Sequence, residues 1–290
     1  MGKNICLQML DKRYVVTAYN RSPEPLKEVT DMGAKPAKSL KDLVGGLQNH
    51  PKVIWVMLTS GEATTNIIHE LSEYCNEGDI IIDGSNSFYK NSIALHENLK
   101  KKGVAYLDAG CSGGPSGALK GMSIMVGGDK EVFEKVENIF RDLSVSNGYL
   151  YVGKSGSGHF TKMVHNAIEY GMMQSLGEGL ELIENGPYKN VDLAKLCKLW
   201  NNGSVIRGYL IELAARAMEK DPHLKDIAPY VEDSGEGRWA VSEAIDNNVP
   251  FSTISYSLFA RIDSRSEKKF QKRVLAALRQ EFGGHAVKKG

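Results

Sequence analysis

A lysine, an asparagine and a glutamate lie close together in the apolar stretch KMVHNAIEYG, residues 162–171. At 3.6 residues per turn, Lys162, Asn166 and Glu169 fall at positions i, i+4 and i+7, so a helix presents them as one stripe. An amine and a carboxyl group held on one rigid helix can exchange protons with a substrate. The commoner role of such a pair is to stabilise a solvated helix face, and the spacing alone leaves both interpretations open.

The stretch lies where the sequence changes from a mixed α/β pattern to a helical one. Before it, short β-rich runs such as VIWVML, DIIIDGSN and VAYLDAG alternate with helical patterns at residues 62–75, 89–101 and 130–143. This alternation is typical of a parallel sheet covered by helices. From Gly158 onward, the periodicity predicts one long helix through about Glu184 and then four helical segments. The boundary falls near residue 155, in the glycine-rich VGKSGSGH.

The composition excludes several classes of function. The chain has 290 residues, of which 42% are hydrophobic, which suits about two folded domains. Lys plus Arg (36) nearly balance Asp plus Glu (35), so no nucleic-acid partner is predicted. The four cysteines and seven histidines are scattered, which argues against disulfides and against a metal site. Because no apolar run has membrane-spanning length and no signal peptide is found, we expect a cytoplasmic protein without membrane contact.

The N-terminal segment predicts a dinucleotide-binding fold whose first strand is absent. MGKNICLQML has the pattern of the first helix of such a fold, and RYVVTAYN has that of its second strand. The phosphate-binding turn G-x-G-x-x-G normally precedes this helix, and only Gly2 matches its last glycine. Asn20, Arg21 and Ser22 follow the second strand, where such folds contact the adenosine ribose. Arg21 could pair with a 2′-phosphate, which favours NADP over NAD, although an arginine after a strand is often surface charge.

These patterns together predict two domains. The first is an α/β dinucleotide-binding (Rossmann-like) domain over residues 1–155, truncated at its N-terminus. The second is an all-α domain over residues 156–290.

Five motifs carry a resemblance to an enzyme family: GMSIMVGG, CSGGPSGA, DGSNS, GHFTKMVHNAIEYGMMQ and RQEFGGH. They resemble decarboxylating 6-phosphogluconate dehydrogenase in its shorter bacterial form, and the similarity runs through essentially the whole chain. KMVHNAIEYG is the most specific part, since related β-hydroxyacid dehydrogenases share the lysine but generally lack the H-N-x-x-E-Y series. The resemblance implies oxidation of 6-phosphogluconate to ribulose 5-phosphate and CO2, a step of the pentose phosphate pathway, with reduction of NADP and no metal.

The resemblance assigns catalytic roles to two residues of the stripe. Lys162 would take the proton from the 3-hydroxyl of the substrate while hydride leaves C3, which requires a neutral amine. After CO2 is lost, Glu169 would give a proton to C1 of the enediol, which requires a protonated carboxyl group. The two side chains therefore need opposite departures from their usual charge states.

The resemblance also implies a set of substrate contacts. They are Asn86 near the substrate and the nicotinamide; Ser112, Gly113 and Gly114 at the carboxylate; His165 and Asn166 at the hydroxyls; Tyr170 and Arg207 at the phosphate; and Arg279 and His285 at the phosphate in a neighbouring subunit's site. The last pair implies a homodimer or homotetramer. Taken alone, SGGPSG reads as a flexible turn and Arg207 as a partner in a helix-surface salt bridge. Glu236 lies where longer members have a phosphate-binding loop, and no contact is transferred to it.

The missing strand is the main departure from the family. That strand lies at the centre of the sheet and its turn holds the pyrophosphate, so its loss leaves backbone groups unpaired. The two explanations are a start codon assigned too late, which the intact stripe favours, and a true fragment. We expect weak or absent NADP binding by the chain as printed. Two other functions stay open: a β-hydroxyacid dehydrogenase acting on a small unphosphorylated acid, and a non-catalytic protein that binds sugar phosphate.

Overall fold

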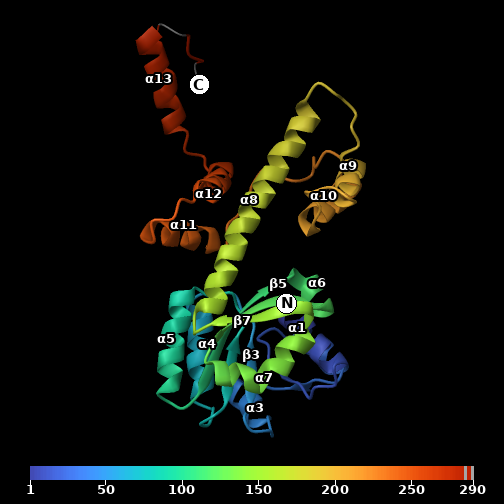
Figure 1. The fold of residues 1–290 in the computed structure, drawn as a ribbon, viewed down its shortest axis with the longest axis vertical. Helices are drawn as coiled ribbons and strands as arrows, with labels where there is room; N and C mark the ends of the chain where they lie inside the picture. The colour runs from blue at the N-terminus through green and yellow to red at the C-terminus, as the bar shows by residue number, and fades with distance from the viewer. Residues whose placement is uncertain (284–285, 289–290) are drawn as a thin grey trace. The chain divides into compact units, whose positions relative to one another are not determined.

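The computed structural model describes residues 1–283 and 286–288, and the chain forms two compact units, Met1–Asn166 and Ala167–Gly290 (Figure 1). The first unit is α/β and the second is helical, which confirms the predicted fold class. The long helix α8 (Ser157–Asn185) begins in the first unit and continues into the second. Its end agrees with the end predicted near residue 184.

The main sheet of the first unit has the strand order β3-β4-β5-β6-β7. The strands are β3 (Val53–Val56), β4 (Ile80–Asp83), β5 (Ala105–Ser112), β6 (Met122–Gly128) and β7 (Ser144–Gly153). The sheet is parallel except that β6 runs antiparallel to β5, a pairing that the sequence does not predict. Only the short helix α6 (Gly114–Lys120) joins these two strands, and a parallel crossover needs a dozen or more residues.

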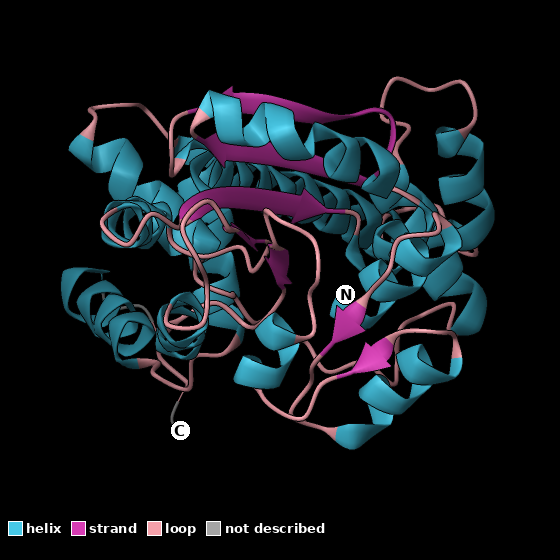
Figure 2. Cartoon of the chain, turned by 90° about the horizontal axis from the view of Figure 1, so that it is seen from below, coloured by secondary structure: helices cyan, strands magenta, loops and turns pink. Residues whose placement is uncertain are grey.

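A second, two-stranded parallel sheet is formed by β1 (Thr17–Ala18) and β2 (Lys35–Pro36), drawn as two short arrows beside the N label in Figure 2. β1 lies within the predicted run RYVVTAYN, whereas β2 escapes prediction because lysine and proline have low β propensity. Among the described residues, β1 pairs only with β2 and β3 pairs only with β4. The break between the two sheets falls where a dinucleotide-binding fold has its first strand.

Helices cover both faces of the main sheet, because alternate residues of its strands point to opposite sides and both sides are apolar. The helices of this unit besides α6 are α1 (Gly2–Asp11), α2 (Pro23–Asp31), α3 (Leu40–Gly45), α4 (Glu62–Ser72), α5 (Tyr89–Lys100) and α7 (Lys130–Leu143). α1 and α7 share a core with Ile80 and Ile82 of β4, while α3, α4 and α5 share the opposite core with Ile81. α4, α5 and α7 confirm the three helices predicted from periodicity.

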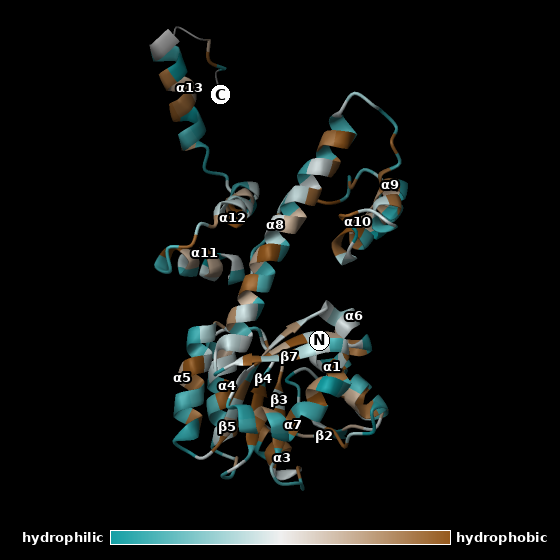
Figure 3. Cartoon of the chain, in the orientation of Figure 1, coloured by the Kyte–Doolittle hydropathy of each residue, from teal (hydrophilic) through white to brown (hydrophobic). Residues whose placement is uncertain are grey.

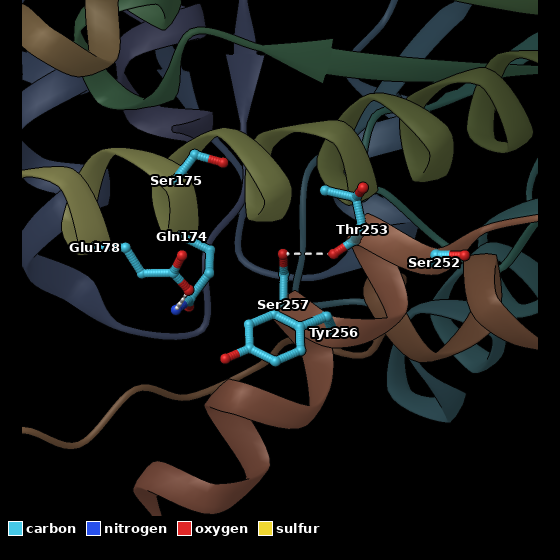
Figure 4. Close-up of a pocket in the computed structure, with 7 residues that line it drawn as sticks. All are labelled: Gln174, Ser175, Glu178, Ser252, Thr253, Tyr256 and Ser257. Carbon is cyan, nitrogen blue, oxygen red and sulfur yellow. Dashed lines mark hydrogen bonds between the residues drawn. The ribbon is translucent and has the colours of Figure 1, made fainter.

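The regular structure described in the second unit is helical. After α8 come α9 (Leu193–Asn201), α10 (Tyr209–Lys220), α11 (Glu236–Asp246), α12 (Ser252–Ser264) and α13 (Phe270–Gly283). α8, α9 and α10 share a core that includes Leu180, Cys197 and Ile211. α8 and α12 flank a hollow of about 320 Å³, where the Ser257 hydroxyl donates to the Thr253 carbonyl of its own helix at 2.9 Å (Figure 4). No described helix is both long and apolar enough to cross a membrane.

Candidate active site

The first turns of α8 hold the lysine of the predicted stripe in a buried position. Lys162 is only 5% exposed, its Nζ donates to Asn166 Oδ1 at 2.5 Å, and it lies 3.4 Å from His165 Nδ1. A lysine with this burial and these partners does not belong to a solvated helix face, so that interpretation is wrong for Lys162. The helix therefore presents an amine, an imidazole and an amide in direct contact with one another.

The ends of two neighbouring strands add two more predicted residues to this group. Ser112, the last residue of β5, has its hydroxyl 3.2 Å from His165 Nε2. Asn86 follows β4, and its Oδ1 accepts the backbone N–H of Cys111 at 3.3 Å. Carboxyl ends of adjacent parallel strands line the ligand crevice in open α/β sheets. The structure thus brings five predicted residues together: Asn86, Ser112, Lys162, His165 and Asn166.

Glycines allow the helix to lie directly on the strand. A Cβ placed on Gly110 of β5 would be 2.4 Å from the Lys162 Cβ and 2.8 Å from the Gly158 carbonyl oxygen. Real Cβ atoms do not come this close to other atoms, so a side chain at residue 110 would displace α8. The absence of a side chain at Gly110 sets the depth at which Lys162 sits.

Gly113 and Gly114 turn the chain from β5 into α6. Their φ angles are +125° and +60°, in the region that favours glycine. The motif SGGPSG is therefore a turn with a defined conformation. The contact of these two glycines with a substrate carboxylate stays a prediction.

A buried carboxylate holds the loop that carries Asn86. Asp83, at the end of β4, accepts hydrogen bonds from the Ser85 N–H at 3.0 Å, the Ser87 hydroxyl at 2.9 Å and the Tyr106 hydroxyl at 3.1 Å. The Ser85 hydroxyl in turn accepts the Leu58 N–H at 3.0 Å. Ser85 replaces a glycine of the family pattern, and its hydroxyl ties the loop to the end of β3.

The buried thiol of Cys111, next to Ser112 in sequence, is kept neutral. Burial raises the pKa of Cys111 to about 12, although the positive charge of Lys162 acts in the opposite direction. Asp83 adds a smaller upward contribution. Because the thiolate is the reactive form of cysteine, Cys111 is a packing residue and not a nucleophile.

A second group of polar residues surrounds Tyr170 in the second unit. Tyr170 is 6% exposed, and the guanidinium of Arg261 on α12 lies 3.5 Å from the centre of its ring. The Ser234 N–H donates to the Tyr170 hydroxyl oxygen at 3.3 Å. A Cβ on Gly237 would lie 2.6 Å from the Tyr170 ring, so the first turn of α11 packs directly against it. A tyrosine hydroxyl, an arginine and the N-terminal end of a helix are groups that bind anions.

Two arginines fix the loop that precedes α11. Arg238 donates to both carboxylate oxygens of Asp233, at 2.8 and 3.0 Å, and Arg265 donates to Oδ2 at 2.5 Å. The hydrogen bonds from Arg238, and then those from Arg265, hold the pKa of Asp233 below its ordinary value. This ion-pair network anchors the loop whose Ser234 contacts Tyr170.

The remaining predicted catalytic and substrate-binding residues are not among the contacts described for either group. Glu169 lies half-buried on α8, next to Tyr170 in sequence. Arg207 is exposed between α9 and α10, and Arg279 is exposed on α13. His285 lies outside the described residues. The roles proposed for these residues stay predictions.

Arg261 is the site residue that sequence reasoning missed. It lies in SLFARIDS, where nothing in the local pattern separates it from an ordinary surface arginine. Its position over Tyr170 is a tertiary contact across 91 residues of sequence (261 minus 170). This contact can be identified only from the folded structure.

The residues predicted to bind the cofactor lie at the ends of β1 and α1. Asn20 Nδ2 donates to the Ser22 carbonyl at 2.8 Å, and Ser22 is the N-cap of α2. Arg21 is exposed beside them. Gly2 is the first residue of α1, and a Cβ placed on it would lie 3.5 Å from the Cβ of Met57, just after β3. Among the described residues, no three His, Cys, Asp or Glu side chains are grouped closely enough to hold a metal ion.

Two family models match consecutive parts of the chain. The NAD binding domain of 6-phosphogluconate dehydrogenase matches residues 1–153, and the 6-phosphogluconate dehydrogenase C-terminal domain matches residues 158–288. The first model fits the α/β part of the structure and the second fits the helical part.

Two curated relatives and a solved structure also indicate the 6-phosphogluconate dehydrogenase family. YqeC of Bacillus subtilis, itself assigned only provisionally as a 6-phosphogluconate dehydrogenase, is 44% identical over 100% of this chain and 96% of its own length. The NAD(+)-dependent, decarboxylating 6-phosphogluconate dehydrogenase of Haloferax volcanii is 39% identical over 99% of this chain and 95% of its own length.

The solved Plasmodium falciparum 6-phosphogluconate dehydrogenase, studied alone and with NADP+ or 6-phosphogluconate, has a TM-score of 0.83 and 30% identity. The match covers 100% of this chain and 64% of the Plasmodium chain. A 3-hydroxyisobutyrate dehydrogenase of Mycobacterium tuberculosis, with a TM-score of 0.70 and 16% identity, shares the fold alone. Because the two family models cover nearly all of the sequence and the first two relatives align along its whole length, the chain belongs to the 6-phosphogluconate dehydrogenase family.

Proposed function

We propose that this chain oxidatively decarboxylates 6-phosphogluconate to ribulose 5-phosphate and CO2 with reduction of NADP. The observation that carries the proposal is the contact of buried Lys162 with His165 and Asn166, beside Ser112 on β5. These are residues at which the family resemblance implies substrate chemistry. In this proposal residues 1–155 bind the cofactor, and residues 156–290 bind substrate and form the dimer.

Lys162 is the base of the oxidation step. Its Nζ takes the proton of the 3-hydroxyl as hydride leaves C3, a transfer for which Lys162 must present a neutral amine. The resulting 3-keto acid loses CO2, because the ketone accepts the electrons of the broken C1–C2 bond. The protonated Lys162 then stabilises the enolate oxygen.

Glu169 is the acid of the last step. It lies seven residues beyond Lys162 on α8, a rise of about 10 Å at 1.5 Å per residue, and on the same stripe of the helix. Its carboxyl group delivers a proton to C1 of the enediol, after which ribulose 5-phosphate can leave. His165 and Asn166 orient the sugar hydroxyls between these two groups.

Tyr170 and Arg261 bind the phosphate of the substrate. The Ser234 N–H already donates to the Tyr170 oxygen, so the Tyr170 O–H is available to donate to a phosphate oxygen. Arg261 supplies a cation beside the ring, against which the first turn of α11 also packs. This assignment adds Arg261 to the phosphate contacts that the resemblance implies at Tyr170, Arg207, Arg279 and His285.

The residues at the N-terminal ends of α1 and α2 fit a dinucleotide phosphate. α1 begins at Gly2 without a side-chain cap, so its first backbone N–H groups can receive an anion. Arg21 is exposed next to the α2 N-cap, where it can pair with a 2′-phosphate. The bound nicotinamide supplies the acceptor of the C3 hydride. Arg21 supports NADP, whereas the Haloferax relative is named for NAD(+).

The active unit in this proposal is a homodimer or homotetramer. α13 carries Phe270, Leu275 and Leu278 with 70%, 62% and 58% of their surface exposed, and brown residues alternate with teal ones along it in Figure 3. An isolated 14-residue helix is marginal in water. A second copy would cover this helix and receive Arg279 near its substrate phosphate.

The test is reduction of NADP or NAD by the purified chain with 6-phosphogluconate, coupled to measurement of CO2. Coenzyme should be supplied up to millimolar concentration, since weak coenzyme binding is expected. Lys162→Met should lower kcat by about 100- to 10,000-fold, the usual range for loss of a general base. Lys154→Met, which changes an exposed lysine just before α8, is the matched control.

Three outcomes would contradict the proposal. Equal activity on gluconate would remove the role of the phosphate group and favour a dehydrogenase for unphosphorylated acids. Binding of 6-phosphogluconate without turnover, in a folded protein that also binds coenzyme, would favour a non-catalytic function. Activity in Lys162→Met equal to that in Lys154→Met would remove Lys162 as the base.

A further inference from the structure

Asp108 is a buried carboxylate for which the proposed reaction has no use. It lies in the middle of β5 with none of its surface exposed. Its Oδ1 accepts the Gly156 N–H at 2.7 Å and its Oδ2 accepts the His159 N–H at 2.9 Å. Both donors lie at the start of α8, where the first backbone N–H groups of a helix have no partner within the helix.

The helix itself balances the charge of this carboxylate. The Asp108 carboxylate accepts these two hydrogen bonds from backbone N–H groups at the start of α8. A negative charge is stabilised at a helix N-terminus by the aligned peptide dipoles. Charge-assisted hydrogen bonds to a carboxylate are also stronger than bonds between neutral groups. Asp108 therefore holds α8 with two strong bonds in a place that water does not reach.

Glycines close the space around this contact. A Cβ on Gly127, which pairs with Asp108 across β5 and β6, would lie 2.8 Å from Asp108 Oδ1. A Cβ on Gly158 would lie 2.4 Å from the Asp108 carbonyl oxygen. The helix is thus seated against backbone on two strands, and it has little freedom to shift without breaking the bonds to Asp108.

Asp108 lies on the same side of β5 as the contacts of the candidate site. Residues i, i+2 and i+4 of a strand share a face, so Asp108, Gly110 and Ser112 form one row. Along α8 they meet the His159 N–H, the Lys162 side chain and the His165 ring, in that order. The helix is held on either side of Lys162, by Asp108 before it and by Ser112 after it.

We propose that Asp108 is a positioning residue, which anchors the first turn of α8 and thereby sets where the Lys162 amine is presented. The role of the amine rests on the function proposed above, whereas the anchoring does not. Its hydrogen bonds are to backbone N–H groups, so Asp108 acts through the backbone at the start of α8.

The test compares Asp108→Asn with Asp79→Asn. The asparagine keeps the shape of the carboxyl group but has one acceptor and one donor group, so one of the two N–H groups faces another donor. Asp79 is the control, because it is also fully buried and accepts two backbone N–H groups, from Lys52 and Asn76, both at 2.8 Å; its Oδ1 also lies 3.7 Å from His50 Nδ1. Those bonds precede β4 and do not involve α8.

Two measurements test whether Asp108 anchors α8, and neither requires enzymatic turnover. Amide hydrogen exchange at Gly156 and His159 should accelerate about 10-fold or more in Asp108→Asn and stay unchanged in Asp79→Asn, which corresponds to loss of one hydrogen bond. Acylation of Lys162 by an amine-reactive ester, followed by peptide mass spectrometry, should be faster only in Asp108→Asn. Urea unfolding of both variants separates these local effects from global destabilisation.

Steady-state kinetics then connect the anchor to the reaction. In Asp108→Asn we expect kcat to fall about 10- to 100-fold while KM for 6-phosphogluconate changes less than about threefold, because a misplaced base affects the chemical step most. Unchanged exchange and acylation would overturn the proposal. Faster exchange with unchanged kcat would overturn the link to Lys162. If the parent chain shows no turnover, the proposed function fails, and exchange and acylation still decide whether Asp108 anchors the helix.

Discussion

The two groups of site residues are held in place by different forces. Around Lys162, position is set by backbone: Gly110 lets the helix touch β5, and Asp108 binds two main-chain N–H groups. Around Tyr170, position is set by charged side chains: Arg261 covers the ring, and Arg238 and Arg265 hold Asp233. In the proposed function the group around Lys162 is the base end, which is held by contacts with backbone, and the group around Tyr170 is the phosphate end, which is held by charged side chains.

This difference fits what each group would do in the proposed function. A proton transfer needs the amine within a few tenths of an ångström of its partner, and contact between backbones gives that accuracy. Binding a phosphate needs positive charge and donors, and it tolerates small displacements. The base end should therefore respond to a single added methyl group and hardly to salt, whereas the phosphate end should respond to charge and ionic strength.

Gly110→Ala tests the base end and should have the largest effect. The added methyl group would come within 2.4 Å of the Lys162 Cβ, so α8 has to move away from β5. We expect kcat with 6-phosphogluconate to fall about 100-fold, by misplacement of the base, and the free energy of unfolding to fall by about 1–3 kcal/mol. Both are measured by steady-state kinetics and urea unfolding, and neither should depend on salt.

Gly179→Ala is the control for this change. It also adds a methyl group to a glycine, here on α8 itself, but the added Cβ meets no atom within 4 Å. The replacement should leave kcat unchanged and raise the free energy of unfolding by up to about 1 kcal/mol, since alanine favours the helix. Equal kinetics in the two variants would mean that contact with β5 does not position Lys162.

Arg261→Met tests the phosphate end and should have a smaller effect. Methionine keeps apolar contact with the Tyr170 ring but removes the cation. KM for 6-phosphogluconate should rise about 10- to 100-fold, as expected for one charged hydrogen bond, with kcat changed only a few-fold. The rise of KM with added salt should also become weaker. Arg207→Met is measured in parallel. The variant with the larger rise in KM identifies the arginine that binds the phosphate: Arg207, which the resemblance indicates, or Arg261, which the fold places on Tyr170.

The sequence predicted the parts of the site that lie on one helix. Lys162, His165 and Asn166 are neighbours because of helical spacing, and such spacing can be read directly from the sequence. Asn86 follows a predicted strand, and such strand ends line the crevice of an open α/β sheet, whereas Ser112 was implied by the family resemblance alone. The resemblance to the family supplied their roles, and the structure supplied their contacts.

The parts that could not be predicted depend on tertiary packing. Arg261 meets Tyr170 only because α12 folds back on α8, and no local pattern encodes that contact. The antiparallel pairing of β6 follows from the length of a connection and not from the strand itself. The sequence does mark Asp108 as unusual, because it is an acid within the apolar run VAYLDAG of a buried strand. The sequence does not indicate which groups bind its carboxylate.

The pH dependence of stability at the phosphate end should be the smallest of these effects. It also distinguishes this end most clearly from the base end. The hydrogen bonds of Arg238, and then of Arg265, lower the pKa of Asp233 in the folded state. A lowered folded-state pKa means that the ionised carboxyl group stabilises the fold above the unfolded-state pKa of about 3.9, and that this stabilisation is lost as the pH falls through the lower folded-state value. Asp233→Asn should therefore reduce the free energy of unfolding at pH 7, with a difference from the parent chain that shrinks below about pH 4 in urea titrations. A difference that stayed constant from pH 7 to pH 3 would show that Asp233 holds its loop by shape, as Gly110 holds α8, and not by charge.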